Sequence, residues 1–405
     1  MLSASRAPLI AIACGGTGGH LFPGLAVAEV LEERGVETLV LISTKEVDRQ
    51  AVRGLPASQV EALPGVGLER GRSLAFARGF VQALGAARRL FRSRPPAAVL
   101  AMGGFTSVPP VLAARRCRAA TFLHEANAIP GRANRWLAHF VDEAFVHFDS
   151  AVERLWHQHI RVVGMPVRSQ FRPADPADCR LALGLRPQDP VLLVTGGSQG
   201  ARALNELVLR TWPSLRLLEP RLQLLHLAGA AEAEAVKKTY AALGGAVLVR
   251  PFLTEMELAL GAATVMVSRA GASSLAEAAA MRVPALVVPL PTAADNHQFY
   301  NARAFVQAGA ARMLNQAEAT PEKVLWELRA LLQDGSQRAA MQAALAKWHA
   351  PEAAAAVAEA MIKRLGLAGR TTPGACAVPA PRPTRGETSP VALPVAPPHT
   401  RTSCP

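Results

Sequence analysis

A single histidine ends a run of glycines near the start of the chain. Residues 15–20 read GGTGGH and follow the apolar run LIAIA at 9–13. Glycines between a strand and a helix leave backbone N–H groups free to contact an anion, most often a phosphate. His20 in such a loop is a candidate general base, and a purely structural histidine is the alternative. The loop lacks G-x-G-x-x-G spacing, so a dinucleotide site is weakly supported, and tight strand–helix packing is the other interpretation.

Similar loops occur later in the chain. GGSQGARALNE at 196–206 offers Ser198 and Gln199 beside bare backbone, with a tight turn as the alternative. In SRAGASSLAEAAA at 268–280, Ser274 and Glu277 have the spacing of a capping box. Glu277 could instead accept hydrogen bonds from a ribose while the loop holds a diphosphate.

Two further loops carry side chains suited to sugar hydroxyls, although each alone could be an ordinary solvated loop. HEANAIPG at 124–131 supplies His124, Glu125 and Asn127. PLPTAADNHQFYNA at 289–302 supplies Asp295, Asn296, His297, Gln298 and Asn301. Every one of these clusters follows a predicted strand, and open α/β sheets bind ligands at the carboxyl ends of their strands.

The elements that must position these loops repeat along the chain. LIAIA, AAVLAM, VLLVT and TVMVS each lead into a glycine or small-residue loop and then a helix. Strands alternating with helices indicate parallel α/β sheets. Pro23 is expected in the first turn of a helix that ends at Gly35. We predict two Rossmann-like domains, at 1–167 and 168–349, followed by a terminal helix at 350–367.

The composition narrows the class of protein. The chain has 405 residues, of which 50% are hydrophobic, enough for two domains with cores of their own. Its five cysteines are scattered without metal spacing or a disulfide framework, which favours a reducing compartment and predicts neither a metal nor a cofactor. Residues 370–405 contain nine prolines, no aromatic residue and one leucine, and are predicted to be disordered.

The formal charge of +13 is unevenly distributed. Residues 68–118 hold ten arginines against the single Glu69, a net +9. Nucleic acid and an anionic membrane surface are the candidate partners, and the few aromatic residues there argue against nucleic acid. A helix-spaced apolar stripe runs through the segment at 74–94, and it predicts either a core-packed or a membrane-interfacial helix; its members are Ala77, Phe80, Leu84, Ala87 and Phe91.

Taken together, these stretches resemble the MurG family of glycosyltransferases. GGTGGHLFPGLAVAE, GGFTS, HEANAIPGRANRWLA, VVGMPVR, GGSQGARALNE, RAGASSLAEAAA and PLPTAADNHQFYNA match its blocks in order, from about residue 8 to 366. The family transfers N-acetylglucosamine from UDP-GlcNAc to undecaprenyl-diphospho-N-acetylmuramoyl-pentapeptide (lipid I), making lipid II for peptidoglycan. The resemblance implies an α/β GT-B fold, with two Rossmann-like domains facing a cleft and the terminal helix crossing back to the first.

The resemblance also implies roles for individual residues. His20 would be the catalytic base, Arg168 would face the UDP diphosphate, and Glu277 would bind the ribose while remaining able to cap its helix without ligand. No metal is implied, and the first domain's glycine loops could hold the acceptor's diphosphate instead. The implied UDP-GlcNAc contacts are Thr17, Gly18, Gly19, Asn127, Arg168, Ser198, Leu253, Ala272, Ser273, Ser274, Leu275, Ala276, Glu277, His297 and Gln298.

A lipid acceptor favours the membrane interpretation of 74–94, with the chain peripheral on the cytoplasmic face of the bacterial inner membrane. Other cell-wall synthesis proteins are possible partners, and nucleic acid is not expected. Phe105, Ala126 and Met165 depart from the family's usual Tyr, Gln and Asn, which predicts altered acceptor contacts. The alternatives are a GT-B enzyme acting on another lipid and a dinucleotide or nucleic-acid binding module.

Overall fold

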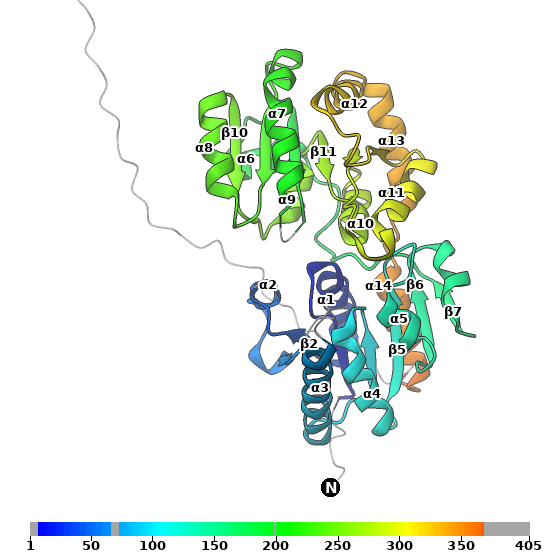
Figure 1. Cartoon of the computed structure of the whole chain (residues 1–405). Helices are drawn as coiled ribbons and strands as arrows, with labels where there is room; N and C mark the ends of the chain where they lie inside the picture. The colour runs from blue at the N-terminus through cyan, green and yellow to red at the C-terminus, as the bar shows by residue number, and fades with distance from the viewer. Residues whose placement is uncertain (1–6, 66–72, 198–199, 368–405) are drawn as a thin grey trace, which may run out of the picture.

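The computed structural model describes residues 7–65, 73–197 and 200–367. The predicted tail at 370–405 and the predicted donor contact Ser198 lie outside these residues. Within them, no helix is both long and apolar enough to cross a bilayer. Two bodies of parallel sheet and helix are stacked one above the other, with the N-terminal body at the bottom of the view (Figure 1).

The N-terminal half is built on a seven-stranded parallel sheet of order β3-β2-β1-β4-β5-β6-β7. Its strands are β1 (Leu9–Ala13), β2 (Glu37–Ser43), β3 (Val60–Leu63), β4 (Ala98–Ala101), β5 (Ala120–Glu125), β6 (Glu143–Val146) and β7 (Ile160–Val162). Its helices are α1 (Gly18–Glu33), α2 (Glu46–Ala51), α3 (Ser73–Ser93), α4 (Val108–Arg116) and α5 (Arg132–Leu137). Short 3₁₀ turns span Ala57–Gln59, Phe105–Ser107 and Asp149–Arg154.

The alternation of side chains in β1 explains why helices cover both faces of this sheet. Leu9, Ala11 and Ala13 belong to one buried cluster, together with residues of α3, α4 and α5. Ile10 and Ile12 point to the opposite cluster, which α1 and α14 (Ala353–Arg364) complete. A strand buried on both sides must be apolar throughout, as LIAIA is.

The C-terminal half has a six-stranded parallel sheet of order β10-β9-β8-β11-β12-β13. Its strands are β8 (Val191–Thr195), β9 (Gln223–Leu227), β10 (Ala246–Arg250), β11 (Val265–Ser268), β12 (Ala285–Val287) and β13 (Arg312–Met313). The helices are α6 (Pro176–Ala182), α7 (Arg202–Leu218), α8 (Ala233–Leu243), α9 (Met256–Ala262), α10 (Ala272–Met281), α11 (His297–Gln307), α12 (Pro321–Gln333) and α13 (Gly335–Trp348), and a 3₁₀ turn spans Ala294–Asn296. Strand–loop–helix units thus form two parallel sheets, as predicted.

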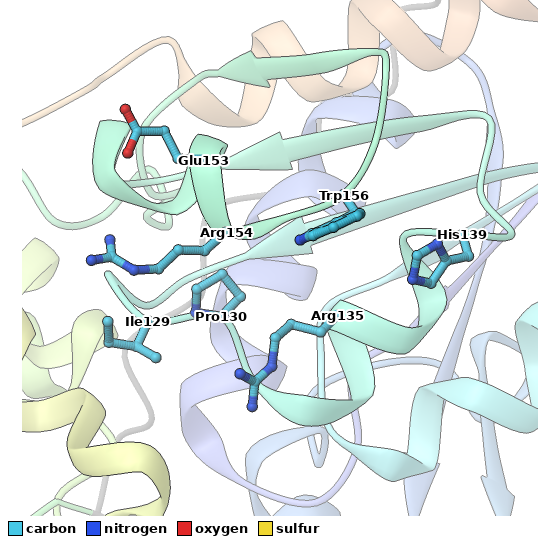
Figure 2. A pocket seen from close by; sticks show the side chains of 7 residues that line it. All are labelled: Ile129, Pro130, Arg135, His139, Glu153, Arg154 and Trp156. Carbon is cyan, nitrogen blue, oxygen red and sulfur yellow. The ribbon is translucent and has the colours of Figure 1, made fainter.

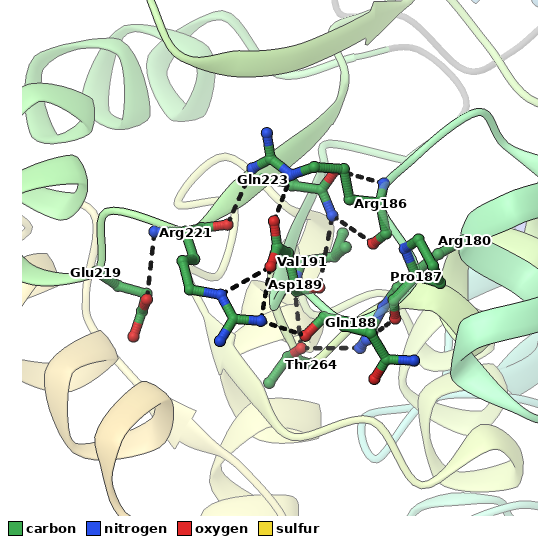
Figure 3. A network of polar contacts seen from close by, with 10 residues as sticks. All are labelled: Arg180, Arg186, Pro187, Gln188, Asp189, Val191, Glu219, Arg221, Gln223 and Thr264. Atoms are coloured by element: carbon green, nitrogen blue, oxygen red, sulfur yellow. Dashed lines mark hydrogen bonds and ion pairs between the residues drawn. The ribbon is translucent and has the colours of Figure 1, made fainter.

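Polar contacts hold the amino-terminal edge of this second sheet (Figure 3). Asp189, just before β8, accepts from Arg221 at 2.8 Å and pairs with Arg186, and both arginines hold the pKa of Asp189 below its usual value. Gln223, at the start of β9, exchanges hydrogen bonds with the Arg186 backbone at 2.7 and 2.9 Å. This network stabilises the amino-terminal edge of the sheet. The carboxyl edge, which faces the N-terminal half, therefore remains free to bind a ligand.

The predicted apolar stripe of α3 is mostly a core face. Ala87 and Phe91 are buried in the N-terminal half, and Phe80 and Leu84 pack against the same cluster. Ala77 is exposed, so the stripe is one turn shorter than predicted. This stripe therefore cannot contact a membrane, because the sheet and α4 already cover it.

The chain passes between the halves twice, and the two crossings touch. Gly164 adopts a φ of +86°, and a Cβ added there would lie 2.3 Å from the Cβ of Ala350. Beside this crossing, the indole of Trp348 stacks on Phe305 with ring centroids 4.3 Å apart and also contacts Phe148 at 5.5 Å. Aromatic packing and a close backbone approach thus join the halves at this crossing.

We expect Gly164→Ala to destabilise the protein more than Gly309→Ala in urea unfolding. Gly309 also has a positive φ, of +69°, but no atom lies within 4 Å of its added Cβ. Its substitution should cost only the backbone term, about 1–2 kcal/mol. Gly164→Ala should cost a further 1–3 kcal/mol, roughly, through overpacking against Ala350. Equal losses for the two variants would contradict a tight crossing.

Candidate functional site

Two helix N-termini meet between the halves. α1 begins at Gly18 and α10 at Ala272, and the Oγ of Ser273 donates a hydrogen bond of 3.0 Å to the Gly19 carbonyl. That carbonyl is free because Pro23, four residues further on, has no N–H to bond it. The expected first-turn place of Pro23 is wrong, since the helix starts well before it. Its effect is instead to open a carbonyl to the opposite half.

The paired helix ends can hold an anion. The first N–H groups of a helix have no intrahelical partner, and each N-terminus carries about half a positive charge. Among the described residues, no side chain caps the first turn of α1 or α10. The predicted contacts Thr17, Gly18, Gly19, Ala272, Ser273 and Ser274 all lie in these two turns.

A buried carboxylate that sequence analysis missed holds the first glycine loop. The Oδ2 of Asp48 accepts hydrogen bonds from the Gly16 N–H at 2.7 Å and from the Ser43 N–H and hydroxyl at 3.1 and 2.5 Å. The Thr106 hydroxyl donates to the Gly15 carbonyl at 2.6 Å. Asp48 occupies the Gly16 N–H, and the N–H groups of His20 and Leu21 bond the Thr17 carbonyl, so the amides of Thr17 to Gly19 remain for a ligand. No local signal marks Asp48, because it follows β2 and its loop partner is 32 residues away.

His20 packs against the second glycine loop of the N-terminal half. A Cβ on Gly103, whose φ is +116°, would lie 2.7 Å from Cε1 of the ring, so this backbone must be bare. Burial lowers the pKa of His20 below its ordinary 6.5, the Met102 carbonyl and Asp48 oppose this, and His297 adds to it. Its Nδ1 is buried without a partner of hydrogen-bond geometry among the described residues. The imidazole is therefore neutral near pH 7.

Arg168 and Glu277 lie near enough for the charge of each to affect the pKa of the other, and Arg168 lies beside Phe22 of α1. The Arg168 guanidinium lies over the rings of Phe22 and Phe171, 4.4 and 5.0 Å from their centroids. Burial raises the pKa of Glu277 to about 7, and the charge of Arg168 opposes that rise. The Nε of Arg168 is buried without a partner among the described residues. An anion between α1 and α10 would meet this guanidinium.

The predicted capping box at Ser274 and Glu277 is wrong. α10 begins at Ala272 with Gly271 as its N-cap, so both residues lie inside the helix. The first turn therefore keeps its N–H groups, and Glu277 lies one turn further along. Leu275 and Ala276 point into the core, with 1% and 5% of their surface exposed, and the Leu275 N–H bonds the Gly271 carbonyl, so these two predicted contacts are not exposed at the site.

Asn127 sits in a network that crosses between the halves. Glu125 is buried and accepts hydrogen bonds from the N–H groups of Asn127 and Gly131 at 2.8 and 3.0 Å, and from the amides of Asn127 and Asn134 at 3.1 and 2.8 Å. Asn301, fully buried in α11, accepts from the Ala128 N–H at 2.9 Å and donates to the Asn127 Oδ1 at 3.1 Å. Glu125 and Asn301, which the sequence offered only as loop side chains suited to sugar hydroxyls, thus orient Asn127.

The remaining predicted contacts are distributed around this junction. The Gln298 Oε1 accepts from the Leu290 N–H at 2.9 Å, which ties that side chain to its own loop. His297 opens α11, bonds the Ala294 carbonyl at 2.8 Å and lies near enough to His20 to affect its pKa. Leu253 is half-buried against the core of the C-terminal half. His124 is buried and bonds the Gly164 carbonyl at 2.9 Å, so it supports the crossing.

The three departures from the family pattern do not all face the site. Ala126 and Met165 are buried, 6% and 2% exposed, and pack with the core of the C-terminal half. Phe105 packs edge-to-face on Phe76 of α3, with ring centroids 5.5 Å apart. Ala126 and Met165 thus contribute to packing, and the altered acceptor contacts stay a prediction.

Comparison with known proteins agrees with this arrangement. The model of the glycosyltransferase family 28 N-terminal domain matches residues 10–146, and that of the C-terminal domain matches residues 191–357. A crystal structure of Acinetobacter baumannii MurG superposes with a TM-score of 0.68 at 28% identity, covering 88% of this chain and all of that one. The GT-B fold class expected from the sequence is thereby confirmed.

Curated relatives share the same name, UDP-N-acetylglucosamine–N-acetylmuramyl-(pentapeptide) pyrophosphoryl-undecaprenol N-acetylglucosamine transferase. The protein of Anaeromyxobacter dehalogenans strain 2CP-1 is 36% identical over 360 residues, 86% of this chain and 91% of the relative. That of Verminephrobacter eiseniae is 42% identical over 317 residues, 76% of this chain and 86% of the relative. The chain therefore belongs to the MurG family, within glycosyltransferase family 28.

Proposed function

We propose that this chain transfers N-acetylglucosamine from UDP-GlcNAc to the 4-hydroxyl of the N-acetylmuramoyl-pentapeptide of lipid I, with inversion, and so makes lipid II. The observation that carries the proposal is the meeting of the α1 and α10 N-termini beside His20, Arg168 and Glu277. This reaction belongs to peptidoglycan synthesis, on which cell shape and division depend.

The leaving group determines what one side of the site must do. The bond from the anomeric carbon to the UDP oxygen breaks, and its electron pair leaves on the diphosphate. The free N–H groups of the helix ends and the Arg168 guanidinium stabilise that charge. The Gly19–Ser273 hydrogen bond already holds the helix ends together, and the rings of Phe22 and Phe171 position the guanidinium. Glu277 accepts hydrogen bonds from the ribose, and Asn127, His297, Gln298 and Ser198 complete the donor contacts.

The acceptor determines what His20 must do. As the acceptor oxygen bonds to the anomeric carbon, its proton passes to the neutral imidazole, which is available because burial lowers the pKa of His20. Gly103 and Gly104 leave room for the ring and fix its plane.

We expect His20→Ala to slow transfer at least about a hundredfold while UDP-GlcNAc binds normally, because only proton removal is lost. The measurement is disaccharide-lipid formation from labelled UDP-GlcNAc and a lipid I analogue. The control is His159→Ala, since His159 is exposed near β7. A variant as fast as wild type would exclude His20 as the base. A wild type that glycosylates only another lipid would favour a GT-B enzyme of different acceptor.

UDP-GlcNAc affinity should fall as pH drops below about 7. The Glu277 carboxyl has its pKa raised to about 7, so it is charged above this pH and protonated below it. The protonated form loses acceptor strength toward ribose, so the dissociation constant should rise by up to tenfold per pH unit, roughly, below the pKa. Calorimetric titrations from pH 5.5 to 8.5 would measure this. Glu277→Gln should bind weakly and without this pH dependence, whereas a flat wild-type profile would contradict the assignment.

We further propose that the outward face of α3 docks on an anionic membrane at the cytoplasmic surface. Leu74 and Val81 are 86% and 67% exposed, and their spacing of seven residues places them on one side of the helix. Arg78, Arg89 and Arg92 continue that side at helical spacing. Apolar side chains between arginines suit the boundary of an anionic bilayer. Lipid I would be met there.

Replacing both Leu74 and Val81 with Glu should weaken sedimentation with phosphatidylglycerol-rich vesicles at least about tenfold, because burial of each side chain contributes roughly 1.5–3 kcal/mol. Leu217→Glu is the matched control, since Leu217 is 85% exposed on α7 of the other half. Equal losses for the control, or none for the double variant, would exclude α3 as the docking surface.

A further inference from the structure

A hollow lies beside the HEANAIPG loop, outside the site described above (Figure 2). Its volume is about 730 Å³, and Ile129 and Pro130 of the loop are among the residues that line it. Arg135 and His139 line it from α5 and the turn that follows, and Arg154 and Trp156 line it from the segment before β7.

The lining combines an aromatic surface with cationic donors. The Trp156 side chain is 80% exposed, unusual for so large an apolar group. The Arg154 guanidinium donates to the Ser150 carbonyl at 2.6 Å, and no carboxylate pairs with it in the described part of the chain. Glu153 also borders the hollow, but its carboxylate points away from Trp156 and Arg135 (Figure 2). Arginine and tryptophan together suit a ligand with short apolar groups and a carboxylate.

The hollow lies within reach of His20. His20 contacts the loop after β4, whereas the near end of the hollow, at Pro130 and Arg154, follows β5 and β6, one or two strands along the sheet. Strands are about 4.8 Å apart, so allowing for the loops the separation is roughly 10–15 Å. Five extended residues span at most about 17 Å.

We infer that this hollow binds the carboxylate-bearing end of the acceptor's pentapeptide; the inference rests on the proposed function. The peptide is attached to the sugar oxygen next to the reacting hydroxyl, so it leaves the site close to His20. Arg154 pairs with the peptide's carboxylate, and Trp156 and Pro130 pack on its short side chains. The hollow thereby selects a lipid that carries the peptide over a bare lipid-linked sugar.

An ion pair with the C-terminal half holds one lining residue of the hollow and provides a control. Arg135 forms an ion pair of 2.7 Å with Asp295, in the turn before α11, and Arg132 shares that carboxylate at 3.5 Å. Among the residues that line the hollow, Arg135 and Arg154 are positively charged and Glu153 is negatively charged, an excess of one positive charge. Arg132 contacts Asp295 without lining the hollow, so its loss tests the ion pair alone.

The test compares two lipid I analogues with the same lipid, one carrying the pentapeptide and one without it. With UDP-GlcNAc saturating, Arg154→Gln should raise KM for the peptide-bearing acceptor about tenfold, the worth of one charge-assisted hydrogen bond. Trp156→Ala should raise it about fivefold or more. For both variants kcat, KM for UDP-GlcNAc and KM for the peptide-free acceptor should stay within twofold of wild type. Arg132→Gln should leave the ratio of the two acceptor KM values unchanged.

A second measurement separates this inference from the proposed function. The free pentapeptide is titrated into wild type and Arg154→Gln by calorimetry, and about tenfold weaker binding to the variant supports the hollow even if wild type transfers sugar to neither acceptor. Equal binding to both proteins, or no binding to either, overturns it. A KM rise of the same size for both acceptors would also overturn it.

Discussion

The hydrogen bond between the Ser273 hydroxyl and the Gly19 carbonyl joins the two helix ends on which the site is built. It exists because Pro23 cannot bond that carbonyl within α1. Pro23 therefore leaves one carbonyl of α1 without its helical hydrogen bond, and that carbonyl bonds a residue of the C-terminal half instead. Two partial positive charges are thereby held together, a repulsive arrangement that an anion between them relieves.

The contacts around this junction divide into those that a ligand can use and those that hold the backbone. Asp48 and Thr106 bind the glycine loop, and Glu125 and Asn301 bind the loop carrying Asn127. A buried carboxylate with several N–H donors fixes a loop more firmly than packing can, because each hydrogen bond has a direction. His20, Arg168 and Glu277 keep polar groups uncommitted, and these are the groups to which we assign the transfer.

The same helix supports the site and, in our proposal, meets the membrane. The inner face of α3 packs on α4 and the sheet, while Phe76 on α3 contacts Phe105 beside the second glycine loop. That loop carries the backbone against which His20 packs. A lipid acceptor approaching along the outer face of α3 would therefore arrive next to the histidine. Because α3 is apolar on its buried face and basic on its exposed face, it can support the site and contact the membrane at the same time.

The sequence by itself determined the strand–loop–helix units, the glycine loops, His20 and the family, because these depend on backbone freedom and periodicity within about ten residues. Only the tertiary structure decided which face of α3 is buried, that Glu277 does not cap its helix, and that Asp48 and Asn301 position the loops. Ser273 and Gly19 are 254 residues apart, and Asn301 and Ala128 are 173 apart. Local patterns carry no information on such pairs, since their meeting depends on how two separately folded sheets are oriented. The hollow at Trp156 likewise depends on the tertiary structure. Folding brings the HEANAIPG loop beside Arg135 and Arg154, and it brings Asp295 beside Arg135.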